Sequence, residues 1–199
     1  MVFIVAGAMI FSQSKFPADT LLAAKDVSLI KKLGILPIAG FQRISYNLNS
    51  MNCQFHPSCS NYGAEAIKEF GLIRGSFIAS DRITRCNPDA LDSHLKSGGA
   101  FNPIDIRLID PLHPAEPNEL QKSPLLAASL SALMPGTGRM YAGRWFDGLM
   151  GLTQFLLYAI ITNYAYKNDR DILAGMVGGI AIITYGGEIY GAYRTAKYY

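Results

Sequence analysis

The sequence predicts an all-α protein with two units, a small cysteine-containing helical hairpin domain and a C-terminal transmembrane helical hairpin. Half of the 199 residues are apolar and only 17% are charged, which is below the quarter that is typical of soluble domains. All three cysteines lie within residues 53–86, and two long uncharged runs follow a proline-rich stretch. We therefore expect four segments, which are residues 1–26, 27–104, 105–122 and 123–199.

The first segment begins with an apolar run at residues 2–11, which is too short to span a bilayer. Small and polar residues at 12–14 are compatible with a cleavage site, but no Lys or Arg precedes the run. Two interpretations stay open, a signal peptide and an apolar anchor at the membrane surface. We expect residues 15–26 to be a polar lead-in.

Residues 27–49 have an amphipathic helical pattern that Pro37 and Gly40 are expected to interrupt. The apolar positions are Leu29, Ile30, Leu33, Leu36, Phe41, Ile44 and Leu48. One interpretation is a core helix of a small domain, and the other is a helix that lies in the plane of a membrane.

A helical hairpin is predicted next, with Ser60 as the N-cap of its first helix and Gly71 as the break between the two helices. The polar side of the second helix carries Asp81, Arg82 and Arg85. For the two arginines, a solvated surface and contacts with lipid phosphate or an acidic partner are both open.

The motifs around this hairpin resemble those of the YidD family, small membrane-associated bacterial proteins described as membrane protein insertion efficiency factors. The motif residues are Cys53, Pro57, Cys59, Ser60, Tyr62, Gly71, Gly75, Arg82, Arg85, Cys86 and Pro88. The resemblance covers residues 35–104, where Gly98-Gly99 and Asn102-Pro103 resemble a Gly-Gly-x-Asp-Pro ending of the family pattern, with Asn102 in place of its Asp. It implies an amphipathic first helix and non-catalytic assistance to the insertion or folding of other membrane proteins. The implied partners are the lipid bilayer, insertion machinery and nascent membrane proteins.

The cysteines allow three states. Cys53, His56, Cys59 and Cys86 have short spacings that could supply four zinc ligands, although Pro57 limits how the loop folds around an ion. A disulfide is favoured in an oxidising compartment and reduced thiols in the cytosol. We expect no metal and no other cofactor.

Catalytic and nucleic-acid functions have little support in this sequence. It contains only three histidines and no recognisable nucleophile elbow, zinc-protease or phosphate-loop motif, so we expect no catalytic residue. The net charge of +3, with no basic stripe, also argues against nucleic acid binding.

Five prolines between residues 88 and 117 indicate a long connector, whose residues 105–122 we expect to form a linker. The apolar residues Ile104, Ile106, Leu108 and Ile109 are compatible with a short strand, or with packing on the hairpin.

The last segment begins with an apolar helix at residues 125–134, which a Pro-Gly turn ends. The motif is similar to the lead-in of small two-span bacterial membrane domains and consists of Pro135, Gly136, Gly138, Tyr141, Gly143 and Gly148. Residues 149–166 and 172–187 are then the predicted spans. A buried hairpin of a soluble protein is the alternative.

The predicted location is the bacterial inner membrane. Basic residues at the flanks of the spans outnumber Lys167 and Arg170 in the turn, which indicates cytoplasmic flanks and a cysteine domain on the cytoplasmic face. These flanking residues are Lys122, Arg139, Arg144, Arg194 and Lys197. A cleaved signal peptide would instead favour an exported, membrane-anchored interaction or structural protein with a disulfide-bonded domain on the periplasmic face.

Overall fold

The computed structural model describes residues 16–48, 53–115 and 122–199. Within these residues, helices dominate and the strands are only two residues long, so the predicted all-α fold is confirmed. The apolar run at residues 2–11, and with it the predicted signal peptide or anchor, lies outside the described residues.

The first two helices, α1 (Pro17–Ala23) and α2 (Leu29–Ser45), pack on each other. Ala18 and Ile35 are fully buried in their common core, and the Gln42 side chain accepts a hydrogen bond from the backbone N–H of Ala18 at 3.0 Å. The polar lead-in that we expected before residue 27 therefore includes a helix that belongs to the domain core.

The α2 helix continues through Pro37 and Gly40, so the predicted interruption is wrong. Proline removes one backbone hydrogen bond from a helix interior. Here α2 packs against both α1 and α3, and this tertiary packing offsets the lost bond.

The predicted hairpin consists of α3 (Cys59–Phe70) and α4 (Leu72–Arg85). The N-cap of α3 is Ser58 and not Ser60, since Ser58 Oγ accepts from the backbone N–H of Asn61 at 3.4 Å. Gly71 separates the helices as predicted, with a φ of 85° and a ψ of 174°, a conformation that strongly favours glycine. At Gly75, a Cβ atom would lie 2.5 Å from the Ile67 Cα, so glycine allows the two helices to approach closely.

The segment after α4 is also ordered against the domain. Strand β1 (Phe55–His56) pairs in parallel with β2 (Leu108–Ile109), and α5 (Ala90–Lys96) lies between them in sequence. Phe55, Ala90 and Leu108 share a buried cluster. The short strand is therefore confirmed for Leu108 and Ile109, whereas Ile104 and Ile106 are exposed. Residues 108–110 of the expected linker are packed parts of the structure.

The C-terminal unit contains α6 (Pro124–Leu133), α7 (Thr137–Tyr141), α8 (Trp145–Lys167) and α9 (Asp171–Tyr198). Gly136 has a left-handed φ of 88° and joins α6 to α7. A Cβ atom on Gly136 would collide with the Gly148 carbonyl, and one on Gly138 with the Ala127 carbonyl. These glycines of the predicted motif therefore permit close backbone packing.

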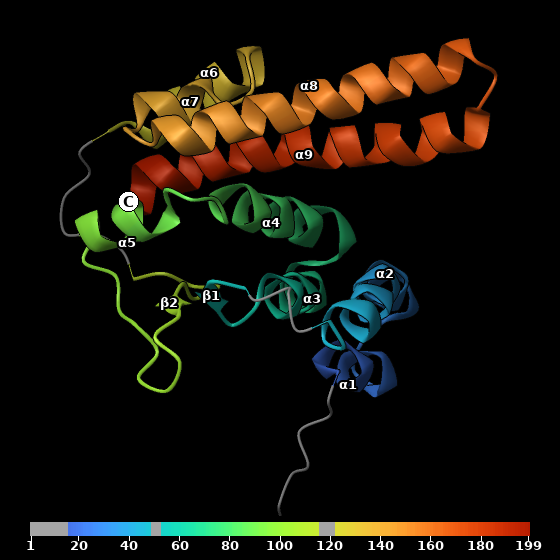
Figure 1. Cartoon of the computed structure of the whole chain (residues 1–199), viewed down its shortest axis with the longest axis horizontal. Coiled ribbons are helices and arrows are strands. Elements are labelled where there is room, and N and C mark those ends of the chain that lie inside the picture. The colour runs from blue at the N-terminus through green and yellow to red at the C-terminus, as the bar shows by residue number, and fades with distance from the viewer. Residues whose placement is uncertain (1–15, 49–52, 116–121) are drawn as a thin grey trace, which may run out of the picture.

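Figure 1 shows α9 between α8 on one side and α4 on the other, with the far halves of α8 and α9 projecting beyond α4. Both helices are long and apolar enough to cross a membrane, and only 17% and 22% of their most apolar windows are buried. Core helices of a soluble protein are mostly buried, so this hairpin does not resemble one.

Candidate membrane-contact surface and its buried charge network

The apolar side of α2 lies on the surface. The seven apolar residues predicted from periodicity are all exposed, by 47% to 74%; they are Leu29, Ile30, Leu33, Leu36, Phe41, Ile44 and Leu48. The core-helix interpretation is wrong for these residues, because other positions on α2, including Ile35 and Ala39, form the packed side. Leu48 lies just beyond the end of α2, and we call it and the six residues of the helix together the α2 apolar face. An exposed apolar helix face of this kind is typical of helices that lie in a membrane interface.

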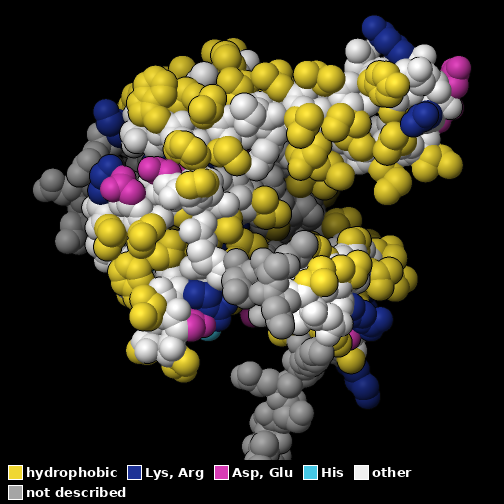
Figure 2. All heavy atoms as spheres, in the orientation of Figure 1, with side chains coloured by type: hydrophobic (Ala, Val, Ile, Leu, Met, Phe, Trp, Pro, Cys, Tyr) yellow, Lys and Arg dark blue, Asp and Glu magenta, His cyan; other side chains and the backbone are white. Residues whose placement is uncertain are grey.

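The projecting half of the hairpin exposes a second apolar surface, which Figure 2 shows as hydrophobic side chains along α8 and α9. Ile160 is 64% exposed, Ile172 84% and Ile182 69%. Charged side chains gather at the turn, where Lys167 and Asp171 are exposed. The apolar surface therefore has a polar end, as a membrane hairpin requires.

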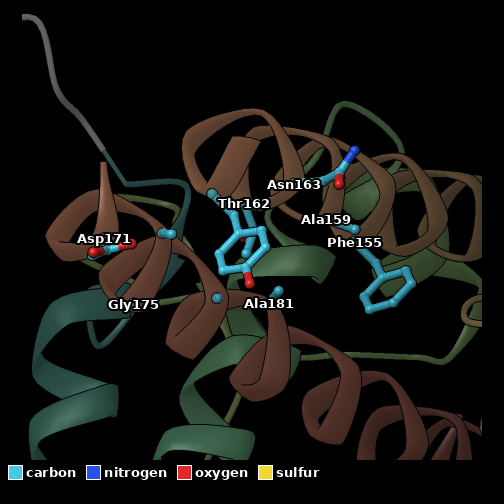
Figure 3. A pocket seen from close by; sticks show the side chains of 10 residues that line it. Phe155, Ala159, Thr162, Asn163, Asp171, Gly175 and Ala181 are labelled. Atoms are coloured by element: carbon cyan, nitrogen blue, oxygen red, sulfur yellow. The ribbon is translucent and has the colours of Figure 1, made fainter. Parts of the chain in front are cut away.

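An open groove runs between α8 and α9 in this projecting half (Figure 3). One side is formed by Phe155, Thr162 and Asn163 of α8, and the other by small residues of α9 such as Gly175 and Ala181. Small residues let another helix backbone approach closely within a membrane. The groove is thus suited to contact with an apolar helix.

The opposite half of α9 meets α4 through buried charges. Asp81 of α4 is fully buried, and its carboxylate binds Arg85 at 3.2 Å, Arg139 at 2.7 Å and Arg194 at 3.4 Å. Arg85 belongs to the same helix, whereas Arg139 lies in α7 and Arg194 in α9. A single carboxylate therefore links the cysteine-containing domain to the C-terminal unit.

Asp110, immediately after β2, is the second buried carboxylate. It binds Arg82 at 3.0 Å, Arg85 at 2.7 Å and Arg194 at 3.4 Å, and accepts a hydrogen bond from the Tyr199 hydroxyl. Since residue 110 lies in the segment expected to be a linker, its position in the core is a correction to that prediction.

Glu188 completes this network within the C-terminal unit. It is 1% exposed and binds Arg139 Nε at 3.1 Å. A Cβ atom on Gly151 would collide with the Glu188 carboxyl group, so the glycine in α8 provides room for it. We call Asp81, Asp110, Glu188 and their arginine partners Arg82, Arg85, Arg139 and Arg194 the charge network.

The charge network changes the interpretation of Arg82 and Arg85. Both were expected on a solvated surface or against lipid phosphate, but they are 0% and 2% exposed. Arg82 lies over the rings of Phe55 and Tyr62, with distances of 4.3 and 4.4 Å to their centroids. In the observed conformation these arginines join protein segments and present no surface to lipid.

The arginines keep the two buried aspartates ionised. Burial alone would raise the pKa of Asp81, but Arg85, Arg139 and Arg194 outweigh it and lower this pKa to about 2. At Asp110, burial is likewise outweighed by Arg85, Arg82 and Arg194, and the pKa is lowered well below its usual range. Asp81 and Asp110 are therefore ionised at neutral pH, whereas burial raises the pKa of Glu188.

The three predicted cysteines come together. Their sulfur atoms lie within 4.8 Å of one another, and all three are partly exposed thiols. The hydrogen bond with Cys53 raises the pKa of Cys59, while the bond from Cys59 lowers that of Cys53. His56 is not part of this cluster. Its Nδ1 lies 2.9 Å from Asn102 and 3.2 Å from Arg107.

Some of the remaining motif residues make hydrogen bonds inside the protein, and others are exposed. Tyr62 is buried and accepts a hydrogen bond from Arg194, Ser60 hydrogen-bonds with Gln42, and the Pro57 carbonyl accepts from Arg82 at 2.9 Å. Pro88 and Gly143 are exposed. The structure thus brings Tyr62 and the arginines into one buried site, and leaves these last two outside it.

Sequence reasoning missed the charge network as a unit. Its members come from α4, α7, α9 and the residue after β2. The pairs Arg139–Glu188, Asp81–Arg139 and Asp81–Arg194 are separated by 49, 58 and 113 residues along the chain. Only the Asp81–Arg85 spacing of one helical turn was visible locally.

The exposed apolar surfaces and the two long apolar helices define a helical protein of the membrane-associated class. Residues 30–94 match the model of the YidD family, whose description is "Putative membrane protein insertion efficiency factor". This chain belongs to the YidD family. That description names an insertion factor and not an enzyme.

Curated relatives carry the same description. The Colwellia psychrerythraea protein is 51% identical over 65 residues, which are 33% of this chain and 79% of the relative. The Oleidesulfovibrio alaskensis protein is 48% identical over 59 residues, covering 30% of this chain and 69% of the relative. The Yersinia pestis protein is 40% identical over 73 residues, covering 37% and 78%. No solved structure is significantly similar to this chain.

Proposed function

We propose that this protein assists the insertion or folding of other membrane proteins at the bacterial inner membrane without catalysing a reaction. The observation that carries the proposal is the exposed α2 apolar face in a chain of the YidD family. An apolar surface of this extent is costly in water and is stabilised by contact with lipid or with an apolar segment of another protein.

The lengths of the α8 and α9 segments support a membrane surface that the hairpin and α2 share. From Gly186 onward α9 packs on α4, and the preceding residues 172–185 extend about 21 Å. Residues 149–166 of α8 extend about 27 Å, and the hydrocarbon core is about 30 Å thick. A hairpin of this reach brings α4 and α2 close to the membrane surface, where the α2 apolar face can enter the interface.

The charge network gives this arrangement its rigidity. Asp81 and Asp110 bind arginines on both sides of the α4–α9 contact, so the domain that carries α2 cannot turn freely relative to the hairpin. A nascent apolar segment that leaves water beside the hairpin would meet the α2 apolar face or the groove of Figure 3. Assistance then consists of offering a prepositioned apolar surface.

We further propose that the cysteine-containing domain lies on the cytoplasmic face. The excess of Lys and Arg at the flanks of the spans supports this orientation, and the ion pairs of Arg139 and Arg194 do not cancel it, because Asp and Glu contribute little to the positive-inside bias. An impermeant maleimide should label Cys53, Cys59 or Cys86 only after spheroplasts are lysed with a metal chelator present. Labelling in intact spheroplasts after reduction would instead support the exported, disulfide-bonded alternative.

The functional test compares the α2 apolar face with a polar position on the same helix. In cells lacking the chromosomal copy, we would express the wild type, the double variant Leu33→Gln/Ile44→Gln and the control Lys32→Gln, and measure insertion of a membrane reporter by protease protection. The double variant should insert less reporter at equal protein level, while the control matches the wild type. Unchanged insertion in cells without the protein would refute the proposed function.

A further inference from the structure

The three cysteine side chains converge from separate parts of the hairpin domain. Cys53 precedes β1, Cys59 is the first residue of α3, and Cys86 is the C-cap of α4. The sulfur atoms of Cys53 and Cys59 are 3.4 Å apart, and all three lie within 4.8 Å of one another. Cys53 and Cys86 are 33 residues apart in the sequence. The fold therefore preorganises the three thiols as one cluster.

The spacing suits three bonds to one metal ion. A metal–sulfur bond of about 2.3 Å places the sulfurs of a three-coordinate ion about 4 Å apart. The Cys53–Cys59 separation is 3.4 Å, and the other two are no more than 4.8 Å. Small rotations of the side chains would therefore allow all three sulfurs to reach an ion at the centre.

The surroundings of the three sulfur atoms suit a soft metal ion. The backbone N–H of Cys59 donates to Cys53 Sγ at 3.4 Å, and the Gln54 side chain donates to Cys86 Sγ at 3.6 Å; hydrogen bonds to a charged form stabilise it. The sulfurs border the apolar cluster of Phe55, Ala90 and Leu108. Thiolate ligands select ions such as Zn²⁺ and Cu⁺ over Mg²⁺ or Ca²⁺.

We propose that Cys53, Cys59 and Cys86 bind one thiophilic metal ion, Zn²⁺ or Cu⁺, through three thiolates and without His56. His56 is left out because neither of its ring nitrogens lies within the cluster, and its Nδ1 contacts Asn102 and Arg107. Three sulfurs are a complete set for Cu⁺, whereas Zn²⁺ takes a fourth ligand from solvent. The ion would join the start of α3, the end of α4 and the segment before β1.

Metal titration of the full-length reduced protein in detergent tests this proposal. Co²⁺ should give thiolate charge-transfer absorption that saturates at one ion per chain, and displacement by Zn²⁺ and by buffered Cu⁺ shows which ion binds more tightly. Cys86→Ser should weaken binding by roughly tenfold or more, while His56→Ala leaves it unchanged. Absence of the absorption, or an equal loss in His56→Ala, would overturn the proposal.

A second measurement does not depend on the folding of a cysteine variant. In the wild-type protein, bound Zn²⁺ or Cu⁺ should protect all three thiols from alkylation, as counted by mass spectrometry, and a chelator should restore the reaction. Unprotected thiols would refute the site. Isolation of the protein from cells with a stable disulfide between two of the cysteines would refute it equally.

Discussion

The α4–α9 contact and the α2 apolar face invert the usual arrangement of a soluble protein. The contact buries Asp81, Arg85 and Arg194 almost completely. On α2, by contrast, large apolar side chains are exposed, and Leu29 is 74% exposed. Lipid competes with protein for apolar side chains, so apolar burial alone gives little preference for one docking position within or beside a membrane. Buried charges are stable only when they are paired, so they can specify one docking position of α9 on α4. Our hypothesis is that the charge network has this role.

The largest expected effect comes from Asp81→Asn. The substitution preserves size but removes the negative charge that Arg85, Arg139 and Arg194 share, and loss of one partner from a buried ion pair costs about 3–5 kcal/mol. Denaturant unfolding in detergent, followed by circular dichroism, should show a loss of this size. Asp169→Asn, at the exposed turn of the hairpin, is the matched control and should change little. A loss below about 1 kcal/mol for Asp81→Asn would show that the charge network does not hold the units together.

Gly187→Ala tests the packing around the buried charges. A Cβ atom at Gly187 would lie 2.7 Å from the Ser80 side chain of α4, whereas Gly179 on the projecting half of α9 has no neighbour within 4 Å. Overpacking costs about 1–3 kcal/mol, while Gly179→Ala should be neutral or stabilising because alanine favours helix by about 1 kcal/mol. The unfolding free energies of the two variants measure the difference. Equal effects would mean that α9 does not pack against α4 in this way.

Acid should weaken the buried region selectively. The pKa of Asp81 is lowered from 3.8 to about 2, so its contribution to stability, on the order of 2 kcal/mol, is present above the unfolded pKa and is lost as pH falls through the folded one. The contribution of Asp81 to the unfolding free energy should therefore be constant between neutral pH and about pH 5 and should decline between about pH 4 and pH 2. Asp81→Asn should decline less steeply. An identical decline in the variant would assign the acid sensitivity to other carboxyl groups.

The smallest effect is expected for an exposed ion pair on the same domain. Arg43 and Asp19 are 3.2 Å apart, with 63% and 30% of their side chains exposed. Surface pairs contribute about 0–1 kcal/mol, so Arg43→Gln should lower the unfolding free energy by less than 1 kcal/mol, and salt should reduce even that loss. A loss comparable to that of Asp81→Asn would remove the distinction between buried and exposed charges.

Local sequence pattern predicted several elements because their causes are local. Gly71 ends α3, the Pro135-Gly136 turn separates α6 from α7, and the uncharged runs become α8 and α9. The same reasoning failed at α4, where Ile73 is 72% exposed and Arg82 is buried. Periodicity shows which residues share a side of a helix, but it does not show what covers that side.

The cysteine cluster illustrates the same limit within a short segment. The sequence placed the three cysteines at the ends of a hairpin, and this much follows from helix length and the Gly71 break. It also suggested His56 as a fourth ligand, but neither ring nitrogen of His56 lies in the cluster, and its Nδ1 contacts Asn102. Asn102 lies far along the chain, and its approach depends on the pairing of β1 with β2.

The sequence by itself determined the helical class, the family motifs, the two apolar spans and the apolar residues of α2, because composition and periodicity are properties of neighbouring residues. Only the tertiary structure decided which side of α2 and α4 faces outward, and which arginines meet Asp81 and Asp110. The physical reason is that burial of a charge depends on partners supplied by distant segments. Those partners are brought together by the packing of α9 against α4.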